Sequence, residues 1–176
     1  MRLFIAVEIP EDLREKIVLL QNDIPREGLK LVEKENLHIT LAFLGEVDER
    51  KKDELVRALG EIKSEKFAMK LGGMGAFPSE NYIRVVWVGV EGEGLKKLHA
   101  RINEALRALH FKTESYSPHL TLARVKEKPS TGLRERVARN KNVSLGECEV
   151  REFLLKKSTL TPKGPIYENV AAFELV

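Results

Sequence analysis

The sequence predicts a mixed α+β protein built from two similar halves. Along the chain, apolar residues switch between a spacing of two, typical of strands, and a spacing near 3.6, typical of helices. An eight-residue pattern centred on His-x-Thr, Glu35–Ala42, returns as Tyr116–Ala123, 81 residues later. Each half, of about 80 residues, is small for an independent fold. We therefore expect two lobes packed side by side as one unit over residues 1–176.

The first half is expected to alternate strands and helices. Strands are expected where apolar residues alternate, and helices where apolar residues form a stripe behind a capping residue. The expected elements are a strand at Arg2–Ile9 ended by Pro10, a helix at Glu11–Asp23, a strand at Leu37–Leu44 closed by Gly45, a helix at Asp48–Glu65 capped by Asp48, and a strand at Lys66–Leu71 running into a glycine-rich turn at 72–75.

The second half repeats this succession. The expected elements are a β-branched strand at Tyr82–Val90, a helix at Gly94–Leu109, a strand at His119–Val125, a short helix near Leu133–Arg139, and two strands around Cys148–Leu155 and Tyr167–Leu175. The internally repeated strand-helix-strand units lie around residues 2–45 and 83–126.

The composition excludes several classes of protein. The longest apolar runs, such as Val85–Val88, are far shorter than the roughly 20 residues of a membrane span, and no cleavable leader is evident. Cys148 is the only cysteine, and no zinc-binding spacing occurs. The net charge of +3 excludes a strongly basic nucleic-acid coat. We expect a cytoplasmic, monomeric protein without metal or cofactor, and its interleaved Lys and Glu resemble proteins of thermophiles.

The repeated motif places an imidazole and a hydroxyl on one face of each strand. Because side chains alternate along a strand, His38 and Thr40 share one face, and His119 and Thr121 share the equivalent face of the second copy. The same alternation places Phe43 in the core. It also predicts that the small side chains Ala42 and Ala123 continue the polar faces and leave room for a ligand.

Two histidines and two threonines that converge on one cleft suit displacement at phosphorus. One neutral imidazole can take a proton from an attacking water or hydroxyl while one protonated imidazole gives a proton to the leaving oxygen. The threonine hydroxyls can donate hydrogen bonds to anionic oxygens. A single His-x-Thr more often reflects packing or surface. Two copies at equivalent places favour a site, because packing alone requires only apolar alternation.

Both motifs resemble the signatures of the 2H phosphoesterase superfamily. The segments are Glu35–Leu41 and Ser117–Arg124, and the opening Arg2–Val7 and the phrase Leu41–Gly45 narrow the resemblance to its RNA 2′,3′-cyclic phosphodiesterase branch, also called 2′-5′ RNA ligase. The resemblance covers essentially the whole chain. It implies a bilobal, pseudo-twofold fold in which two antiparallel sheets, flanked by outer helices, enclose a central cleft.

The resemblance also implies an activity and roles for residues. The activity is hydrolysis of an RNA-terminal 2′,3′-cyclic phosphate to a 2′-phosphate, with 2′-5′ ligation to a 5′-hydroxyl end as a second reaction. The implied proton donor is His38, the implied proton acceptor is His119, and Thr40 and Thr121 bind phosphate oxygens. Chemistry alone does not assign the two histidines. The resemblance implies that the partners are RNA ends with cyclic phosphates, including tRNA fragments. It also implies that nucleotides bind in the cleft.

Arg124 fits the resemblance as a phosphate contact, but strict alternation places it on the face of Leu120 and Leu122. It reaches the cleft only if the strand ends or bulges before it. The weaker candidates for RNA contact are Trp87, which more often belongs to a core, the loop aromatics Tyr82 and Tyr116, and a modest basic rim of Lys34, Arg84, Lys126 and Lys128. We assign no role to His99 or His110.

Two alternatives remain open at this stage. The same site suits a phosphodiesterase for small cyclic nucleotides or cyclic-phosphate metabolites. It also suits a binding module that holds RNA ends without turning them over.

Overall fold

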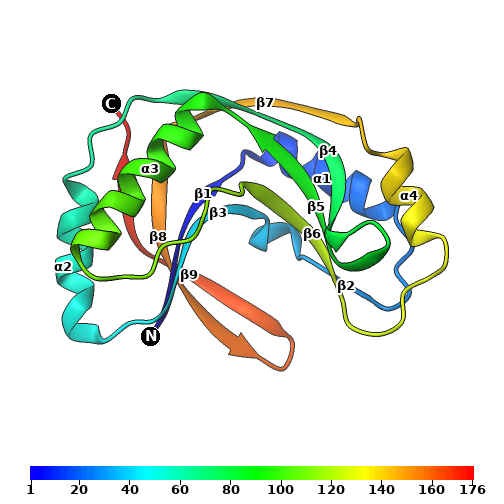
Figure 1. Ribbon diagram of the computed structural model, residues 1–176, viewed down its shortest axis with the longest axis horizontal. Helices are drawn as coiled ribbons and strands as arrows, with labels where there is room; N and C mark the ends of the chain where they lie inside the picture. Colours follow the sequence, from blue (N-terminus) through cyan, green and yellow to red (C-terminus); the bar gives the residue numbers. More distant parts are fainter.

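The computed structural model describes the whole chain, residues 1–176. Nine strands form one curled antiparallel sheet, and the helices lie on its outer side (Figure 1). The strands are β1 (Arg2–Glu8), β2 (Leu29–Leu31), β3 (His38–Glu46), β4 (Phe67–Ser79), β5 (Tyr82–Glu91), β6 (His119–Val125), β7 (Ser144–Val150), β8 (Glu152–Thr161) and β9 (Gly164–Glu174). The helices are α1 (Glu11–Asn22), α2 (Glu49–Gly60), α3 (Glu93–Ala108) and α4 (Leu133–Arg139), with a 3₁₀ turn at Lys34–Asn36.

Two arms of the sheet meet at a single pair of residues. The strand order is β7-β4-β5-β6-β3-β1-β8-β9, with β2 added to β6. β3 and β6 are joined only through Ile39 and Leu120. These two residues are 81 positions apart, so they are the same position of the two sequence repeats. The pseudo-twofold axis that relates the lobes therefore passes between them, and the predicted α+β fold of two antiparallel lobes is confirmed.

The helices tie the two arms together. α1 follows β1 of one arm but packs against β6 and β7 of the other, while α3 follows β5 and packs against β3 and α2 as well as β4. In Figure 1, α1 and α4 accordingly lie on one side of the molecule and α2 and α3 on the other. A continuous core of 36 buried residues runs between sheet and helices. This exchange buries apolar surface that each half of about 80 residues would leave exposed.

Most predicted elements are present, with shifted ends. The Asp48 carboxylate accepts a hydrogen bond from the Arg50 backbone N–H at 2.9 Å, which confirms the N-cap of α2. That helix ends at Gly60, five residues before its predicted end. The region around Cys148–Leu155 is two strands rather than one, because the chain leaves β7 and enters β8 at Arg151. β2, three residues long, is absent from the sequence-based prediction.

The glycine-rich segment at 72–75 was predicted as a turn, and this prediction is wrong. β4 continues through it to Ser79, with an irregularity in its pairing to β5 between Gly72 and Met74. Gly73 adopts a φ of +74°, which favours glycine. Gly75 leaves no room for a side chain, because a Cβ there would meet the Trp87 ring. The glycines therefore serve a bulged strand and an aromatic neighbour.

Candidate active site

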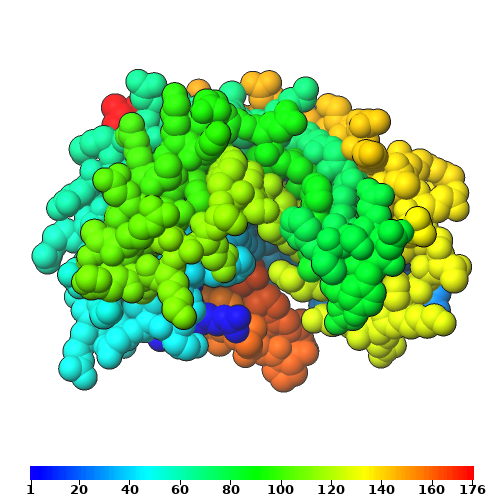
Figure 2. All heavy atoms as spheres, in the orientation of Figure 1, coloured from blue at the N-terminus to red at the C-terminus, as the bar shows by residue number.

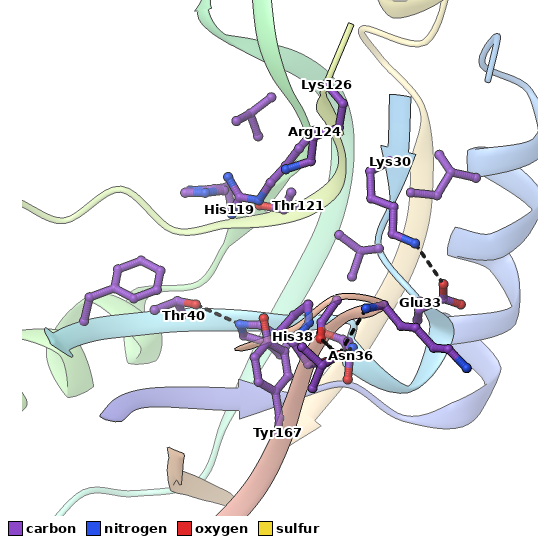
Figure 3. Close-up of a pocket in the computed structure, with 18 of the residues that line it drawn as sticks. Lys30, Glu33, Asn36, His38, Thr40, His119, Thr121, Arg124, Lys126 and Tyr167 are labelled. Atoms are coloured by element: carbon purple, nitrogen blue, oxygen red, sulfur yellow. Dashed lines mark hydrogen bonds and ion pairs between the residues drawn. The ribbon is translucent and has the colours of Figure 1, made fainter. Parts of the chain in front are cut away.

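A cavity of about 700 Å³ opens on the concave side of the sheet, where the two arms meet. It is visible in Figure 2 as a hollow below the green and yellow-green segments, with the β8–β9 hairpin behind it in orange. The sequence-predicted residues all line it: His38, Thr40, His119, Thr121 and Arg124. In Figure 3, His38 and Thr40 lie on one wall and His119 and Thr121 on the other.

The sheet register explains this convergence. Because β3 and β6 are antiparallel through Ile39 and Leu120, the flanking residues alternate to the opposite face, toward the cavity. His38 and Thr40 flank Ile39 on β3, and His119 and Thr121 flank Leu120 on β6. The two motifs therefore form one site across the pseudo-twofold axis.

Both imidazoles are held in the same way. His38 Nδ1 lies 2.6 Å from the Asn36 carbonyl oxygen, and His119 Nδ1 lies 2.8 Å from the Ser117 carbonyl oxygen. A carbonyl oxygen only accepts, so Nδ1 carries the proton in each ring. Nε2 of each neutral ring is then the free basic nitrogen. His38 Nε2 lies 2.9 Å from Thr40 Oγ1, which donates to it when the ring is neutral.

The turn that carries the Asn36 carbonyl group is itself anchored. The buried Arg14 donates from Nη1 to the Lys34 carbonyl oxygen at 2.7 Å and from Nε to the Ile9 carbonyl oxygen at 3.1 Å, which holds the 3₁₀ turn before His38. The Asn36 side chain donates to the Pro165 carbonyl oxygen at 3.3 Å and joins this turn to the β8–β9 hairpin.

A second buried cluster anchors the loop before His119. Asn103 of α3 donates to the Glu114 carbonyl oxygen at 3.2 Å, and the buried His99 ring packs at 5.0 Å from the Tyr116 ring. Burial lowers the pKa of His99, which favours its neutral form. His99 had no role in the sequence analysis, and its place in the structure is beneath the loop that carries Ser117.

The two catalytic candidates differ in their surroundings. His38 forms a cluster with the rings of Phe4 and Tyr167, at 5.2 and 5.3 Å, whereas the ring of His119 packs perpendicular to that of Phe77 at 5.0 Å. Burial lowers the pKa of His38 to about 4. His38 is therefore neutral at pH 7 in the free protein.

An ion pair between a buried lysine and an exposed glutamate lies next to His38. Lys156, with 6% of its surface exposed, donates to Glu8 Oε1 at 2.5 Å, and Glu8 is the residue paired with His38 between β1 and β3. The Lys156 cation adds to the lowering of the His38 pKa, and the Glu8 carboxylate opposes it. The ion pair thus brings a cation close to the first histidine.

A bulge in β6 brings Arg124 into the cavity. In the pairing with β5, Thr121 is opposite Trp87 and Ala123 is opposite Val86, so Leu122 is an extra residue. Leu122 and Ala123 are both buried, and the alternation resumes one residue out of phase. Arg124 therefore lies on the face of His119 and Thr121. The strand therefore bulges before Arg124, which is the condition under which this side chain was expected to reach the cleft.

β3 carries the same bulge at the same position of its repeat. Leu41 is the extra residue in the pairing with β1, and Phe43 points into the cavity with 56% of its surface exposed. The prediction that Phe43 belongs to the core is wrong. The prediction that Ala42 and Ala123 leave room for a ligand is also wrong, because both are buried in the core. Phe43 and Arg124 are thus equivalent positions with different chemistry.

The weaker sequence candidates are dispersed. Lys126 lines the cavity, but Lys34, Arg84 and Lys128 do not. Trp87 packs against Phe77 at 5.1 Å, outside the cavity lining, and Tyr116 lines a smaller adjoining cavity of about 90 Å³. Lys30, Phe77 and Tyr167 also line the cavity but were not predicted from the sequence, because they come from strands other than the two that carry the motifs. No local pattern marks them.

Comparisons with known proteins identify the family. The model of the family "LigT like Phosphoesterase" matches this chain twice, over residues 7–87 and 88–167. The chain belongs to the LigT-like phosphoesterase family. The two matches follow one another along nearly the whole chain, in keeping with the internal repeat of the sequence.

Relatives of this LigT-like phosphoesterase match it over nearly their full length. The RNA 2′,3′-cyclic phosphodiesterase of Methanocaldococcus jannaschii is 46% identical over 172 residues, 97% of this chain and 98% of the relative. The protein of the same name from Archaeoglobus fulgidus is 44% identical over 177 residues, 99% of this chain and 100% of the relative.

Solved structures share the fold. The TT0787 protein of Thermus thermophilus has a TM-score of 0.85 and 34% identity, covering 99% of this chain and 98% of that one. E. coli LigT complexed with 3′-AMP has a TM-score of 0.82 and 29% identity, covering 99% of this chain and 97% of that one. None of the helices of this LigT-like phosphoesterase combines the length and the apolar surface of a membrane span. No cluster of three or more His, Cys, Asp or Glu side chains forms a metal site.

Proposed function

We propose that this chain hydrolyses RNA-terminal 2′,3′-cyclic phosphates to 2′-phosphates and leaves a free 3′-hydroxyl. The observation that carries the proposal is the pair of His-x-Thr motifs, which line one cavity from two strands and have the same Nδ1 hydrogen bond in each copy. The relatives named RNA 2′,3′-cyclic phosphodiesterase support the substrate class.

In this proposal, His119 is the base and His38 is the acid. Nε2 of His119 accepts a proton from water while the water oxygen forms its bond to phosphorus. The bond between phosphorus and O3′ breaks, and Nε2 of His38 donates its proton to the departing oxygen. Thr40 and Thr121 donate hydrogen bonds to the non-bridging oxygens, and the Arg124 guanidinium balances their charge. Solvent then removes a proton from His119, and His38 takes up a proton again when the next substrate binds.

The low pKa of His38 makes its protonation depend on substrate. Its pKa of about 4 leaves it neutral at pH 7 in the free protein. A phosphodiester anion beside the ring favours the imidazolium, because opposite charges within a few ångströms stabilise the charged form. Binding of the substrate thus raises the pKa of His38 and protonates the ring that acts as the acid.

The activity is tested with an oligoribonucleotide that ends in a 2′,3′-cyclic phosphate. With EDTA present, we expect conversion to a product heavier by one water. A phosphomonoesterase then removes the terminal phosphate from this product and leaves a 2′,3′-diol. Analysis of the intact product by phosphorus NMR distinguishes a 2′-phosphate from a 3′-phosphate. An unchanged oligonucleotide, or a 3′-phosphate product, contradicts the proposal.

The roles of the two histidines are tested with a better leaving group. p-Nitrophenolate departs without protonation, so a phosphodiester that carries it does not need the acid. We expect His38→Ala to lose far less activity on this substrate than on the cyclic phosphate, and His119→Ala to lose activity on both. The opposite pattern would assign the base to His38, whose neutral state in the free protein suits that role.

The same site is proposed to catalyse a second reaction, 2′-5′ ligation of RNA ends. Joining a cyclic phosphate to a 5′-hydroxyl replaces the water by that hydroxyl, so the base and the acid keep their positions. Addition of 5′-hydroxyl RNA to the same assay tests it: a longer product whose junction resists 3′-5′-specific nucleases supports 2′-5′ ligation, and hydrolysis alone contradicts it.

A further inference from the structure

The cavity extends beyond the two motifs along β2 and β6. Four cationic side chains line it, Lys30, Arg124, Lys126 and Lys163, and Glu33 is the only acidic one. A cyclic phosphodiester carries a single negative charge. Two threonine hydroxyls and one guanidinium are enough to bind it. The lysines are therefore in excess of what the reacting phosphate requires.

Two of these lysines form a row with Arg124. Lys30 and Arg124 are paired residues of neighbouring strands, and Lys126 lies two residues further along the chain, just after β6 ends. Two strand residues span about 6.6 Å, a separation similar to that of successive phosphates in a nucleotide chain. In Figure 3, Arg124 and Lys126 lie next to each other above His119, and Lys30 lies to their right on the neighbouring strand β2.

These cations are available for a ligand. No ion pair involves Arg124 or Lys126. Lys30 approaches Glu33 at 3.7 Å, but both side chains are more than half exposed, so this contact is weak. The row also continues into basic surface: residues 124–141 contain seven Lys and Arg against two Glu, a net charge of +5 in a chain whose total is +3.

We propose that Lys30 and Lys126 form a second phosphate subsite, which binds the phosphodiester on the 5′ side of the terminal nucleotide. The inference rests on the proposed function and deepens it: the preferred substrate is the end of an RNA chain, and a cyclic mononucleotide lacks one of the two anions that the cleft binds. The RNA chain then leaves the cleft over the basic segment that follows β6.

The experiment compares two substrates. The value of kcat/KM is measured for a 2′,3′-cyclic-phosphate pentanucleotide and for a 2′,3′-cyclic mononucleotide, and their ratio isolates the subsite. We expect the ratio to exceed about ten in the wild type and to fall about tenfold in the Lys30→Ala/Lys126→Ala double variant. Lys97→Ala, which removes an exposed lysine of α3 remote from the cavity, is the matched control and should keep the wild-type ratio.

A binding measurement separates failure of the subsite from failure of the proposed function. The dissociation constant of a fluorescein-labelled pentanucleotide with a 2′-phosphate end requires no turnover. We expect it to rise about tenfold in the double variant, and the salt dependence of log K to become shallower by about 1.4, or 0.7 for each lost contact. If neither substrate is hydrolysed, the proposed function fails, and this measurement still decides the subsite. A wild-type ratio near one, or equal losses on both substrates with unchanged binding, overturns the subsite.

Discussion

The side-chain amide of Gln21, at the end of α1, donates a hydrogen bond to the backbone carbonyl oxygen of Leu122 at 3.0 Å. Leu122 is the extra residue of the β6 bulge. The same Nε2 donates to the Val32 carbonyl oxygen at 2.9 Å, and the Val32 N–H donates to the Leu122 oxygen at 2.9 Å. A buried glutamine thus satisfies carbonyl groups at the irregularity that turns Arg124 into the cavity.

Replacing Gln21 by leucine is expected to loosen this bulge. The variant has a similar volume but leaves the Val32 carbonyl oxygen without its side-chain donor, which costs about 1–3 kcal/mol of folding free energy. Because Arg124 follows the bulge, we expect KM for the cyclic phosphate to rise several-fold with a smaller change in kcat. Steady-state kinetics and chemical denaturation measure the two effects.

A double-mutant cycle shows whether Gln21 acts through Arg124. If it does, Gln21→Leu should have little further effect on KM in an Arg124→Ala background, because the residue it positions is already absent. Fully additive effects would mean that the glutamine has only a structural role.

The bulges also mark the limit of what the sequence reveals. His38, Thr40, His119 and Thr121 were predicted from the repeat and strand alternation, and all four line the cavity. Alternation failed two residues later, at Ala42 and Ala123. An extra residue in a strand moves every later side chain of that strand to the opposite face. The bulge itself depends on hydrogen bonds from groups distant in sequence, such as Gln21.

Cavity residues outside the motifs could not be predicted from the sequence for a related reason. Tyr167 and Lys30 reach the cavity because the sheet curls and two arms meet. Strand order is set by long-range packing, which local spacing does not encode. The helix starts were predicted to within one residue, since amphipathic stripes and the Asp48 cap are local signals.

Removal of either imidazole is expected to abolish most turnover. We expect His38→Ala and His119→Ala each to lower kcat for the cyclic phosphate by roughly 10²–10⁴ while the fold is retained. Circular dichroism checks the fold, and the wild-type rate is expected to have a bell-shaped dependence on pH. Near-normal rates in both variants would exclude the acid–base mechanism.

The equivalent positions Phe43 and Arg124 provide a matched pair of variants. A guanidinium binds inorganic phosphate directly, whereas an exposed aromatic ring offers a face to a base. We expect Arg124→Ala to weaken competitive inhibition by inorganic phosphate about tenfold, and Phe43→Ala to leave this inhibition constant unchanged. Equal effects of the two substitutions would contradict the assignment of Arg124 as the phosphate contact.

The ion pair next to His38 is expected to tune its titration. Lys156 lowers the pKa of His38, as does Arg14, and Glu8 raises it. Lys156→Met removes one cation and leaves the Glu8 carboxylate, so the pKa of His38 should rise. NMR titration of the His38 ring protons measures this shift. Lys157→Met is the control, because neighbouring strand residues face opposite sides of the sheet; a shift of the same size there would contradict the local effect.

The neutral state of His38 in the folded protein predicts how stability depends on pH. Its pKa is about 4 in the folded protein against a usual 6.5. Between these values the unfolded chain binds more protons than the folded one, so stability is complete above pH 6.5 and is lost as pH falls toward 4. The loss from this group is at most about 3 kcal/mol.

Replacing His38 by glutamine isolates this contribution. Glutamine keeps a polar side chain of similar size but does not titrate, so the free energy of unfolding should fall less between pH 7 and pH 4.5 than in the wild type. Guanidinium denaturation at both pH values measures the difference. Part of the pH dependence will remain, because burial also lowers the pKa of His99. An identical pH dependence in the two proteins would show that His38 takes up its proton in the folded state as readily as in the unfolded chain, and the substrate-dependent loading of the acid would then lose its physical basis.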